Sequence, residues 1–261
     1  MQSSNPVLSR DGAFTRGGYA TFGQAPPAEQ LQEMYDAPAY TGTRPMTIDD
    51  VVMRTGLLLA IVAGVGGLSW YLNVGFGVAI VAALAGFGVA MVVTFKRVLN
   101  PGLVVTYAAL EGVFLGVISH VFNDMYPGIV VQAVLGTGAA FAGMLFAYKS
   151  GKIRVTPRFT KILIGATLGF LGLAVINLVA SFFVDGGLGL RGDSGILPLL
   201  FGAAGVVLAS LFLALDFHLV EEGIKAGAPE KESWLAAFGL TVTLVWLYLE
   251  MLRLIAVLRG E

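Results

Sequence analysis

MRTGLLLAIVAGVGGLSWYLNVGFGVAIVAALAGFGVAMVVTF, residues 53–95, is an apolar block with a single charged side chain, that of Arg54. A helix needs about 20 apolar residues to cross a bilayer core, so this block is too long for one crossing and long enough for two. The cluster of Asn73, Gly75 and Gly77 in its middle is typical of a turn. The block therefore predicts two membrane-spanning helices, 53–72 and 74–95, joined by a tight hairpin.

The rest of the chain continues the pattern with five further apolar stretches. Hydrophobic residues make up 56% of the 261 residues and charged residues only 13%, against about 25% charged in soluble domains. Thr47, followed by Asp49 and Asp50, supplies a cap and first-turn acids for the first helix. The sequence predicts an all-α membrane protein, a seven-helix transmembrane bundle over residues 51–261, whose remaining spans are 102–122, 128–148, 161–183, 196–220 and 235–258.

Residues 1–50 differ from the rest of the chain in composition. Pro, Gly, Ser, Gln and Ala alternate there with scattered charges, as in SSNPVLSRDGAFTRGG and FGQAPPAEQ. Such a segment cannot bury enough apolar surface to offset its chain entropy. We expect a disordered cytoplasmic tail.

The loops predict the orientation of the bundle. Lys96 and Arg97 follow the second span, and residues 149–161 carry five basic side chains and no acid. The opposite loops hold Arg191 alone. Because Lys and Arg are enriched in cytoplasmic loops, the N-terminus is expected in the cytoplasm and the C-terminus outside. The many glycines inside the spans, such as Gly112 and Gly116, are expected to be helix-packing faces.

Three carboxylates, those of Glu111, Asp216 and Glu250, fall inside predicted spans. An ionisable group in the hydrocarbon costs at least about 2.5–3.5 kcal/mol, so such residues are candidates for a functional site, although a paired structural role is the alternative for each. Glu111 and Glu250 are expected near the midplane, where they could share a cavity, and Asp216 about four residues from the cytoplasmic end of its helix. The candidate counter-charges are Arg54, Lys96, Arg97 and Arg253, the last of which can pair with Glu250 at i,i+3.

The last two spans carry a family resemblance. LFLALDFHLVEEGI at 211–224, WLAAFGLTVTLVWLYLEMLRLIAVL at 234–258 and YAALEGVFLG at 107–116 resemble the Bax-inhibitor-type family in its bacterial branch. The resemblance implies seven helices and a pair of buried acids, one in helix six and one in helix seven, that closes a pH-sensitive calcium leak. It also implies an assisting basic residue at the inner end of helix two. Asp216 matches the first acid, and Lys96 or Arg97 occupies the neighbourhood of the basic residue.

The second acid departs from the family pattern. When the terminal Leu-Arg of the family is laid on Leu252 and Arg253, the helix-seven acid falls on Thr243. Glu250 lies seven residues further, about 10 Å along the helix. One expectation is that Glu250, with Glu111, has taken over the acidic role. The alternative keeps the family geometry, with the Thr243 hydroxyl in place of a carboxylate.

These residues suggest ion transport and give no sign of catalysis. Carboxylate oxygens are calcium ligands, and they also exchange protons. The function expected is a pH-sensitive calcium leak channel in the bacterial plasma membrane, with Asp216, Glu250 and Glu111 as tentative calcium ligands and no other cofactor. One alternative is an interaction protein that modulates a membrane protease or a stress response, and another is a proton-coupled transporter. No catalytic motif is present, and a net charge of −1 makes nucleic acid an unexpected partner.

Reporter fusions test the orientation. A reporter that is active only in the cytoplasm should work when fused to the N-terminus or inserted in the 149–161 loop, and should fail at the C-terminus, because the loop Lys and Arg are so unequally divided. A C-terminal fusion active in the cytoplasm would contradict the seven-span topology.

Overall fold

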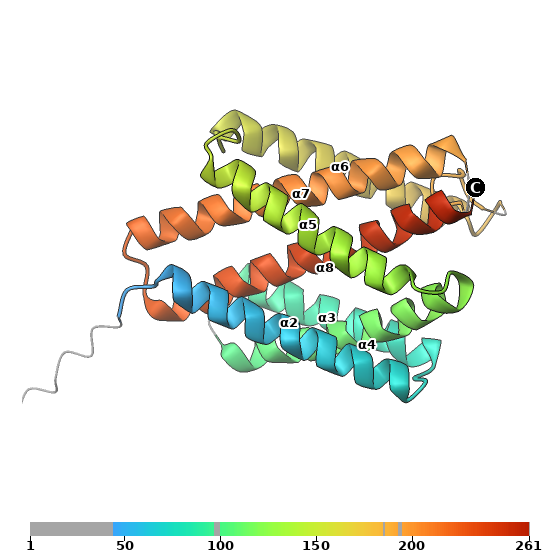
Figure 1. Cartoon of the computed structure of the whole chain (residues 1–261), viewed down its shortest axis with the longest axis horizontal. Coiled ribbons are helices and arrows are strands. Elements are labelled where there is room, and N and C mark those ends of the chain that lie inside the picture. The colour runs from blue at the N-terminus through green and yellow to red at the C-terminus, as the bar shows by residue number, and fades with distance from the viewer. Residues whose placement is uncertain (1–43, 97–99, 185, 193–194, 261) are drawn as a thin grey trace, which may run out of the picture. The chain divides into compact units, whose positions relative to one another are not determined.

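Seven long helices make up the described part of the chain in the computed structural model (Figure 1). The structure describes residues 44–96, 100–184, 186–192 and 195–260. Each of the seven helices is long and apolar enough to cross a membrane, and the predicted all-α seven-helix fold is confirmed. The helices are α2 (Ile48–Tyr71), α3 (Phe76–Lys96), α4 (Pro101–Met125), α5 (Ile129–Lys149), α6 (Pro157–Ala180), α7 (Ile196–Lys225) and α8 (Ser233–Arg259), and the 3-10 helix η1 (Glu230–Glu232) precedes α8.

The helix ends follow local sequence signals. Thr47 caps α2 in a capping box, in which its hydroxyl accepts from the Asp50 backbone N–H and the Asp50 carboxylate accepts from the Thr47 backbone N–H. Asn73, with a φ of 50°, turns the chain between α2 and α3, as the hairpin prediction required. The helix α7 runs five residues past the predicted end at 220, and within its last turns Lys225 pairs with Glu221 at 2.8 Å and with Glu222 at 3.2 Å.

The closest helix contact is the one between α2 and α4, and glycines make it possible. A β-carbon at Gly112 would lie 2.9 Å from the Val62 carbonyl oxygen, and one at Gly116 would overlap the backbone of Gly66. The two backbones therefore meet along a Gly-lined seam, which only residues without side chains allow. The prediction that Gly112 and Gly116 form a packing face is confirmed.

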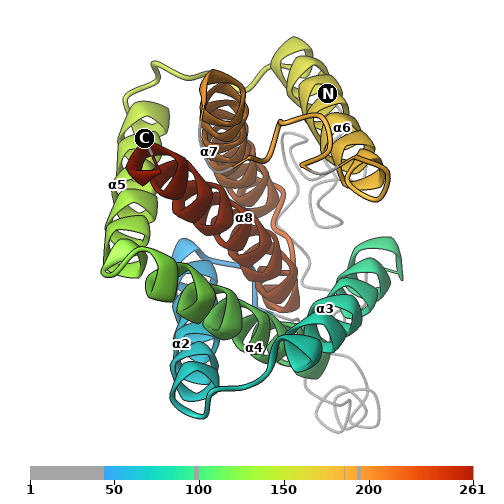
Figure 2. The ribbon, with the colours of Figure 1, turned by 90° about the vertical axis from the view of Figure 1, so that its right-hand side faces the viewer.

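The helix α8 is the centre of the bundle. It packs on α2, α4, α5 and α7, and in Figure 2 it runs between α7 on one side and α4 on the other. Each of the three buried apolar clusters contains α8 residues, among them Phe238, Leu247 and Leu252. The helix α6 has contacts chiefly with α7. Any interaction that holds α8 thus influences most of the bundle.

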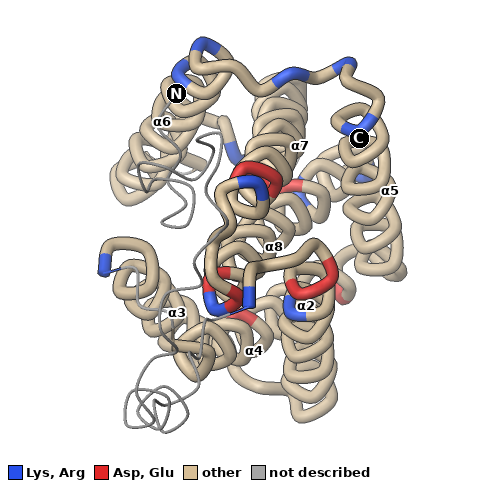
Figure 3. The backbone as a smooth tube through the Cα atoms, turned by 90° about the vertical axis from the view of Figure 1, so that its left-hand side faces the viewer, with Lys and Arg blue, Asp and Glu red and all other residues tan. Residues whose placement is uncertain are grey.

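Positive charge gathers at one end of the bundle, which Figure 3 views face-on. We call this the basic end. It is where α2, α4, α6 and α8 begin, and it carries Lys96, Lys149, Lys152, Arg154 and Arg158. The opposite end, where α8 finishes, is called the C-terminal end. The structure thus places the basic loops together, as the loop pattern requires, while the direction of the bundle in a membrane stays a prediction.

Residues 44–47, which we call the N-terminal strap, belong to the packed unit. The Met46 N–H donates to the Ala228 carbonyl oxygen at 2.7 Å, and the Glu230 N–H donates to the Arg44 carbonyl oxygen at 2.8 Å. The Met46 side chain is only 4% exposed. The predicted tail of 1–50 therefore ends earlier than expected, since residues 44–50 pack on the bundle. Residues 1–43 lie outside the described part of the chain.

The glycine seam yields a stability prediction. Gly116→Ala should destabilise the protein by about 1–3 kcal/mol, because the added methyl group forces α2 and α4 apart. Gly64→Ala is the control. Gly64 lies on an exposed face of α2, where nothing lies within 4 Å of a β-carbon. This substitution should leave stability unchanged or raise it slightly. Thermal unfolding of the detergent-solubilised variants measures both, and equal melting temperatures would show that the seam is looser than described.

Candidate functional site

Asp216 is hydrogen-bonded across the α7–α8 interface. Its Oδ2 accepts from the Thr243 hydroxyl, with 2.6 Å between the oxygens. Thr243 is buried and Asp216 is half-buried. Because α7 continues to Lys225, Asp216 lies nine residues from the helix end, about 14 Å by helix rise. It is therefore deeper than the four residues expected from the sequence.

The Asp216 carboxylate lines a cavity of about 210 Å³ near the basic end. Glu232 contributes a second carboxylate to this cavity, and Gly239 faces Asp216 from α8. Met46 of the strap also lines it and packs against Gly223, where a β-carbon would lie 3.0 Å from the methionine methyl group. The strap thus covers the cavity, which sequence patterns could not indicate because the strap and α7 are far apart in the chain.

Thr243 occupies the position that the family resemblance assigned to the helix-seven acid. The structure pairs it with Asp216, so the alternative with a hydroxyl in place of a carboxylate matches the geometry. Glu250 has no contact with Asp216 among the hydrogen bonds and ion pairs of the described residues. The expectation that Glu250 replaces the missing acid does not match this arrangement, since Glu250 lies two turns further toward the C-terminal end.

Glu250 is buried in a cluster of its own, with 4% of its surface exposed. Its Oε1 lies 3.8 Å from Arg191 Nη2, and its Oε2 lies 3.9 Å from Arg253 Nη1, so the predicted i,i+3 pair is present at long range. The indole N–H of Trp246 donates to Oε1 at 3.4 Å. Arg253 in turn donates to the Leu190 carbonyl oxygen at 2.7 Å. The acid therefore connects α8 to the loop that joins α6 to α7.

The Glu250 carboxylate also fits closely against α7. A β-carbon at Gly205 would lie 2.6 Å from Glu250 Oε2. That oxygen and Arg253 Nη1 are buried and have no hydrogen-bond partner among the residues that the structure describes. A buried charge needs compensation, and two guanidinium groups surround this one. The arrangement is that of a structural ion cluster near the C-terminal end.

Glu111 lies in a third place, between α4 and α3. A β-carbon at Gly86 of α3 would come within 3.6 Å of Glu111 Oε1. Tyr107, one turn earlier on the same face of α4, is buried and packs its ring on Phe238 of α8 at 4.9 Å. The neighbours of Glu111 and Glu250 differ, so the structure does not bring these acids into one cavity. No group of three His, Cys, Asp or Glu residues that could hold a metal ion is found in the described ranges.

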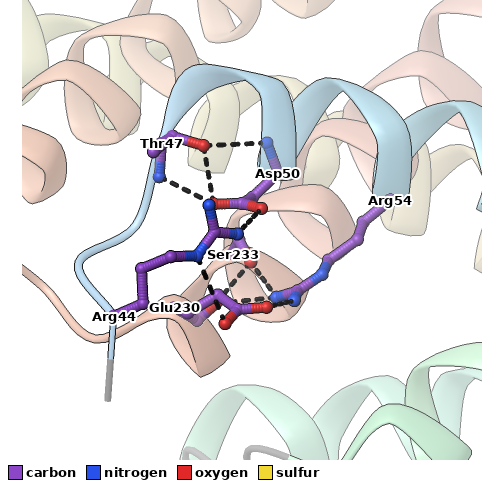
Figure 4. Close-up of polar contacts among 6 residues, drawn as sticks. All are labelled: Arg44, Thr47, Asp50, Arg54, Glu230 and Ser233. Carbon is purple, nitrogen blue, oxygen red and sulfur yellow. Dashed lines mark hydrogen bonds and ion pairs between the residues drawn. The ribbon is translucent and has the colours of Figure 1, made fainter. Parts of the chain in front are cut away.

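The candidate counter-charges also lie in different parts of the structure. Arg54 binds Glu230 at 2.6 Å and donates to the Ser233 hydroxyl (Figure 4). Its guanidinium carbon also lies 5.0 Å from the centre of the Trp234 ring. It therefore connects α2 to the start of α8. Lys96 is exposed at the end of α3 and has no ion pair within the described residues. Arg97 lies outside them.

A polar cluster surrounds Arg54 at the basic end, as Figure 4 shows. Arg44 pairs with Asp50 at 2.5 Å and approaches Glu230 at 3.7 Å. Asp50 is only 3% exposed and also bonds Thr47. The cluster joins the strap, α2 and the α7–α8 connection, and it thereby holds Met46 in place over the Asp216 cavity. Its members are Arg44, Thr47, Asp50, Arg54, Glu230 and Ser233.

Comparison with known protein families gives one match. The family model described as Bax inhibitor 1 like matches residues 5–260, nearly the whole chain. A comparison with curated proteins gave no match. The family match covers all seven helices and both halves of the Asp216–Thr243 pair. The chain therefore belongs to the Bax inhibitor 1 like family of membrane proteins.

Proposed function

We propose that the protein is a pH-sensitive cation leak channel, with calcium as the ion, in which the Asp216–Thr243 pair closes the basic end. The observation that carries the proposal is the hydrogen bond from the Thr243 hydroxyl to Asp216 Oδ2 at 2.6 Å, which joins α7 to α8 beneath the strap. In this proposal the basic end faces the cytoplasm of a bacterium, as the loop charges favour.

The cavity beside the pair supports a cation as the ligand. Asp216 and Glu232 both line it, and carboxylate oxygens are the ligands that calcium prefers. Its volume of about 210 Å³ is well above the ~10–15 Å³ needed for a single water molecule, so water can complete the coordination shell.

Protonation of Asp216 supplies the pH sensitivity. An ionised carboxylate only accepts hydrogen bonds, and a charge-assisted bond is roughly twice as strong as a neutral one. Protonation therefore weakens the attachment of α7 to α8 and also removes the negative charge beside the cavity. Because the attachment is strongest when Asp216 is ionised, the leak should rise as the pH falls.

Asp216→Asn should raise the calcium leak at neutral pH and flatten its pH dependence. The asparagine carbonyl oxygen can still accept from the Thr243 hydroxyl, but the bond loses its charge assistance, about 1–1.5 kcal/mol, which shifts the closed-to-open ratio by about five- to tenfold. Flux of calcium from proteoliposomes that contain a calcium-sensitive dye measures the effect at pH 6, 7 and 8.

Glu222→Gln is the control, because it removes the same charge from an exposed position on α7 that does not line the Asp216 cavity. An Asp216→Asn protein that melts like the wild type but leaks no more than the control would exclude Asp216 as the closing group. If wild-type vesicles show no flux at all, and a membrane protease copurifies with the protein, the interaction-protein alternative gains instead.

Thr243→Val should increase the leak about ten- to a hundredfold, because it removes the donor of a charge-assisted bond, worth about 1.5–3 kcal/mol, while Asp216 keeps its charge. The pH dependence should become weaker, because protonation of Asp216 no longer weakens a bond to Thr243. Thr241→Val is the matched control, since the Thr241 hydroxyl donates to the Ala237 carbonyl oxygen within α8 and has no role between helices. Equal flux from these two variants would show that the Thr243 hydroxyl does not hold the basic end closed.

A further inference from the structure

A large cavity lies away from all three intramembrane acids, none of which lines it. It is a groove of about 1350 Å³ between α2 and α5, and α4, α7 and α8 form its floor. Figures 1 and 2 show α2 and α5 flanking α8 on the same side of the bundle. Apolar side chains line most of it, among them Leu59, Val62, Phe141, Leu145 and Leu244.

The groove reaches the basic end, where its lining becomes charged. Lys149 and Arg154 stand at this mouth, both exposed. Glu221 also lines the mouth, but it accepts from the Tyr148 hydroxyl at 2.5 Å and pairs with Lys225 at 2.8 Å. Lys149 and Arg154 form no ion pair with any described residue. The mouth therefore presents two uncompensated positive charges above an apolar groove.

The groove runs along most of the bundle. From Lys149 to Val130, which both line it, α5 runs nineteen residues, about 28 Å by helix rise, close to the hydrocarbon core of a bilayer, about 30 Å thick. The acyl chain of a lipid whose phosphate lies at Lys149 and Arg154 would occupy the half of the groove nearest the basic end, as far as Gly138, which is eleven residues, or about 16 Å, from Lys149.

We propose that this groove binds an anionic phospholipid, with the phosphate at Lys149 and Arg154 and an acyl chain between α2 and α5. Basic side chains at the cytoplasmic surface attract anionic lipids, and the apolar lining favours a chain over a soluble anion. The site is separate from the proposed closing pair, because neither Asp216 nor Thr243 lines the groove. It therefore stands whether or not the protein conducts ions.

Two pairs of variants separate the headgroup from the chain. Lys149→Gln with Arg154→Gln removes the charges at the mouth, and Arg158→Gln with Lys161→Gln removes the same charge from nearby exposed positions that do not line the groove. Gly138→Leu fills the groove at a point where nothing lies within 4 Å of a β-carbon. Gly143→Leu adds the same side chain to α5 at an equally open position outside it.

Native mass spectrometry of the full chain in detergent, titrated with phosphatidylglycerol or with phosphatidylcholine of the same acyl chains, provides the test. The wild type should prefer phosphatidylglycerol by about 25-fold, since each of the two basic residues contributes about fivefold to binding an anionic surface. The Lys149/Arg154 double variant should lose this preference, and the Arg158/Lys161 variant should keep it. Gly138→Leu should weaken binding of both lipids, and Gly143→Leu should not.

Three results would overturn the proposal. Equal loss of preference in both charge variants would indicate general attraction to the basic loop. If Gly138→Leu binds lipid as the wild type does, the acyl chain does not lie in the groove at Gly138, either because it binds elsewhere or because protein side chains already fill the groove. Competition by glycerophosphoglycerol, which has the headgroup and no chains, at the same concentration as the lipid would identify a soluble anion as the ligand.

Discussion

A charged group inside an apolar bundle must find a partner close by, and this constraint organises the whole structure. Asp216 takes the hydroxyl of Thr243 and Glu250 takes two guanidinium groups, whereas Glu111 lies at a separate interface, between α4 and Gly86 of α3. Leaving such a group unpaired costs more than most single contacts contribute. The acids are consequently distributed over three interfaces. The one at Asp216 joins two helices next to a cavity at the basic end.

The position of α8 explains why a single hydrogen bond could matter for a channel. It packs against four other helices and contributes to every buried cluster. At its start, Ser233 and Glu230 bind Arg54 of α2, and one turn past Gly239 it holds Asp216 of α7 through Thr243. A change at the Asp216 cavity can therefore move the strap, α2 and α7 together. The groove between α2 and α5 shares this floor, so a bound lipid would stiffen the same helix.

The helices could be predicted from the sequence because they depend on local patterns. The capping signals at Thr47, the turn at Asn73 and the long apolar runs each need only a few neighbouring residues. The site depended on contacts between distant segments. The sequence of α8 offers both Glu250 and Thr243 as partners for Asp216. Only the packing of α7 on α8 decides which of them forms the hydrogen bond. The partners of Arg54 lie more than 170 residues away in the sequence. The strap that covers the cavity is similar in amino-acid composition to the segment that precedes it, so the sequence did not distinguish the two.

A double-mutant cycle on calcium flux tests the central claim most directly. If the Thr243 hydroxyl closes the basic end by holding Asp216, then Thr243→Val should increase the leak in the wild-type background and have no further effect in an Asp216→Ala background, because its acceptor is already gone. The two substitutions would then show a coupling as large as the Thr243→Val effect itself. Full additivity of the two effects would contradict the account, since it would mean that the residues act at separate places.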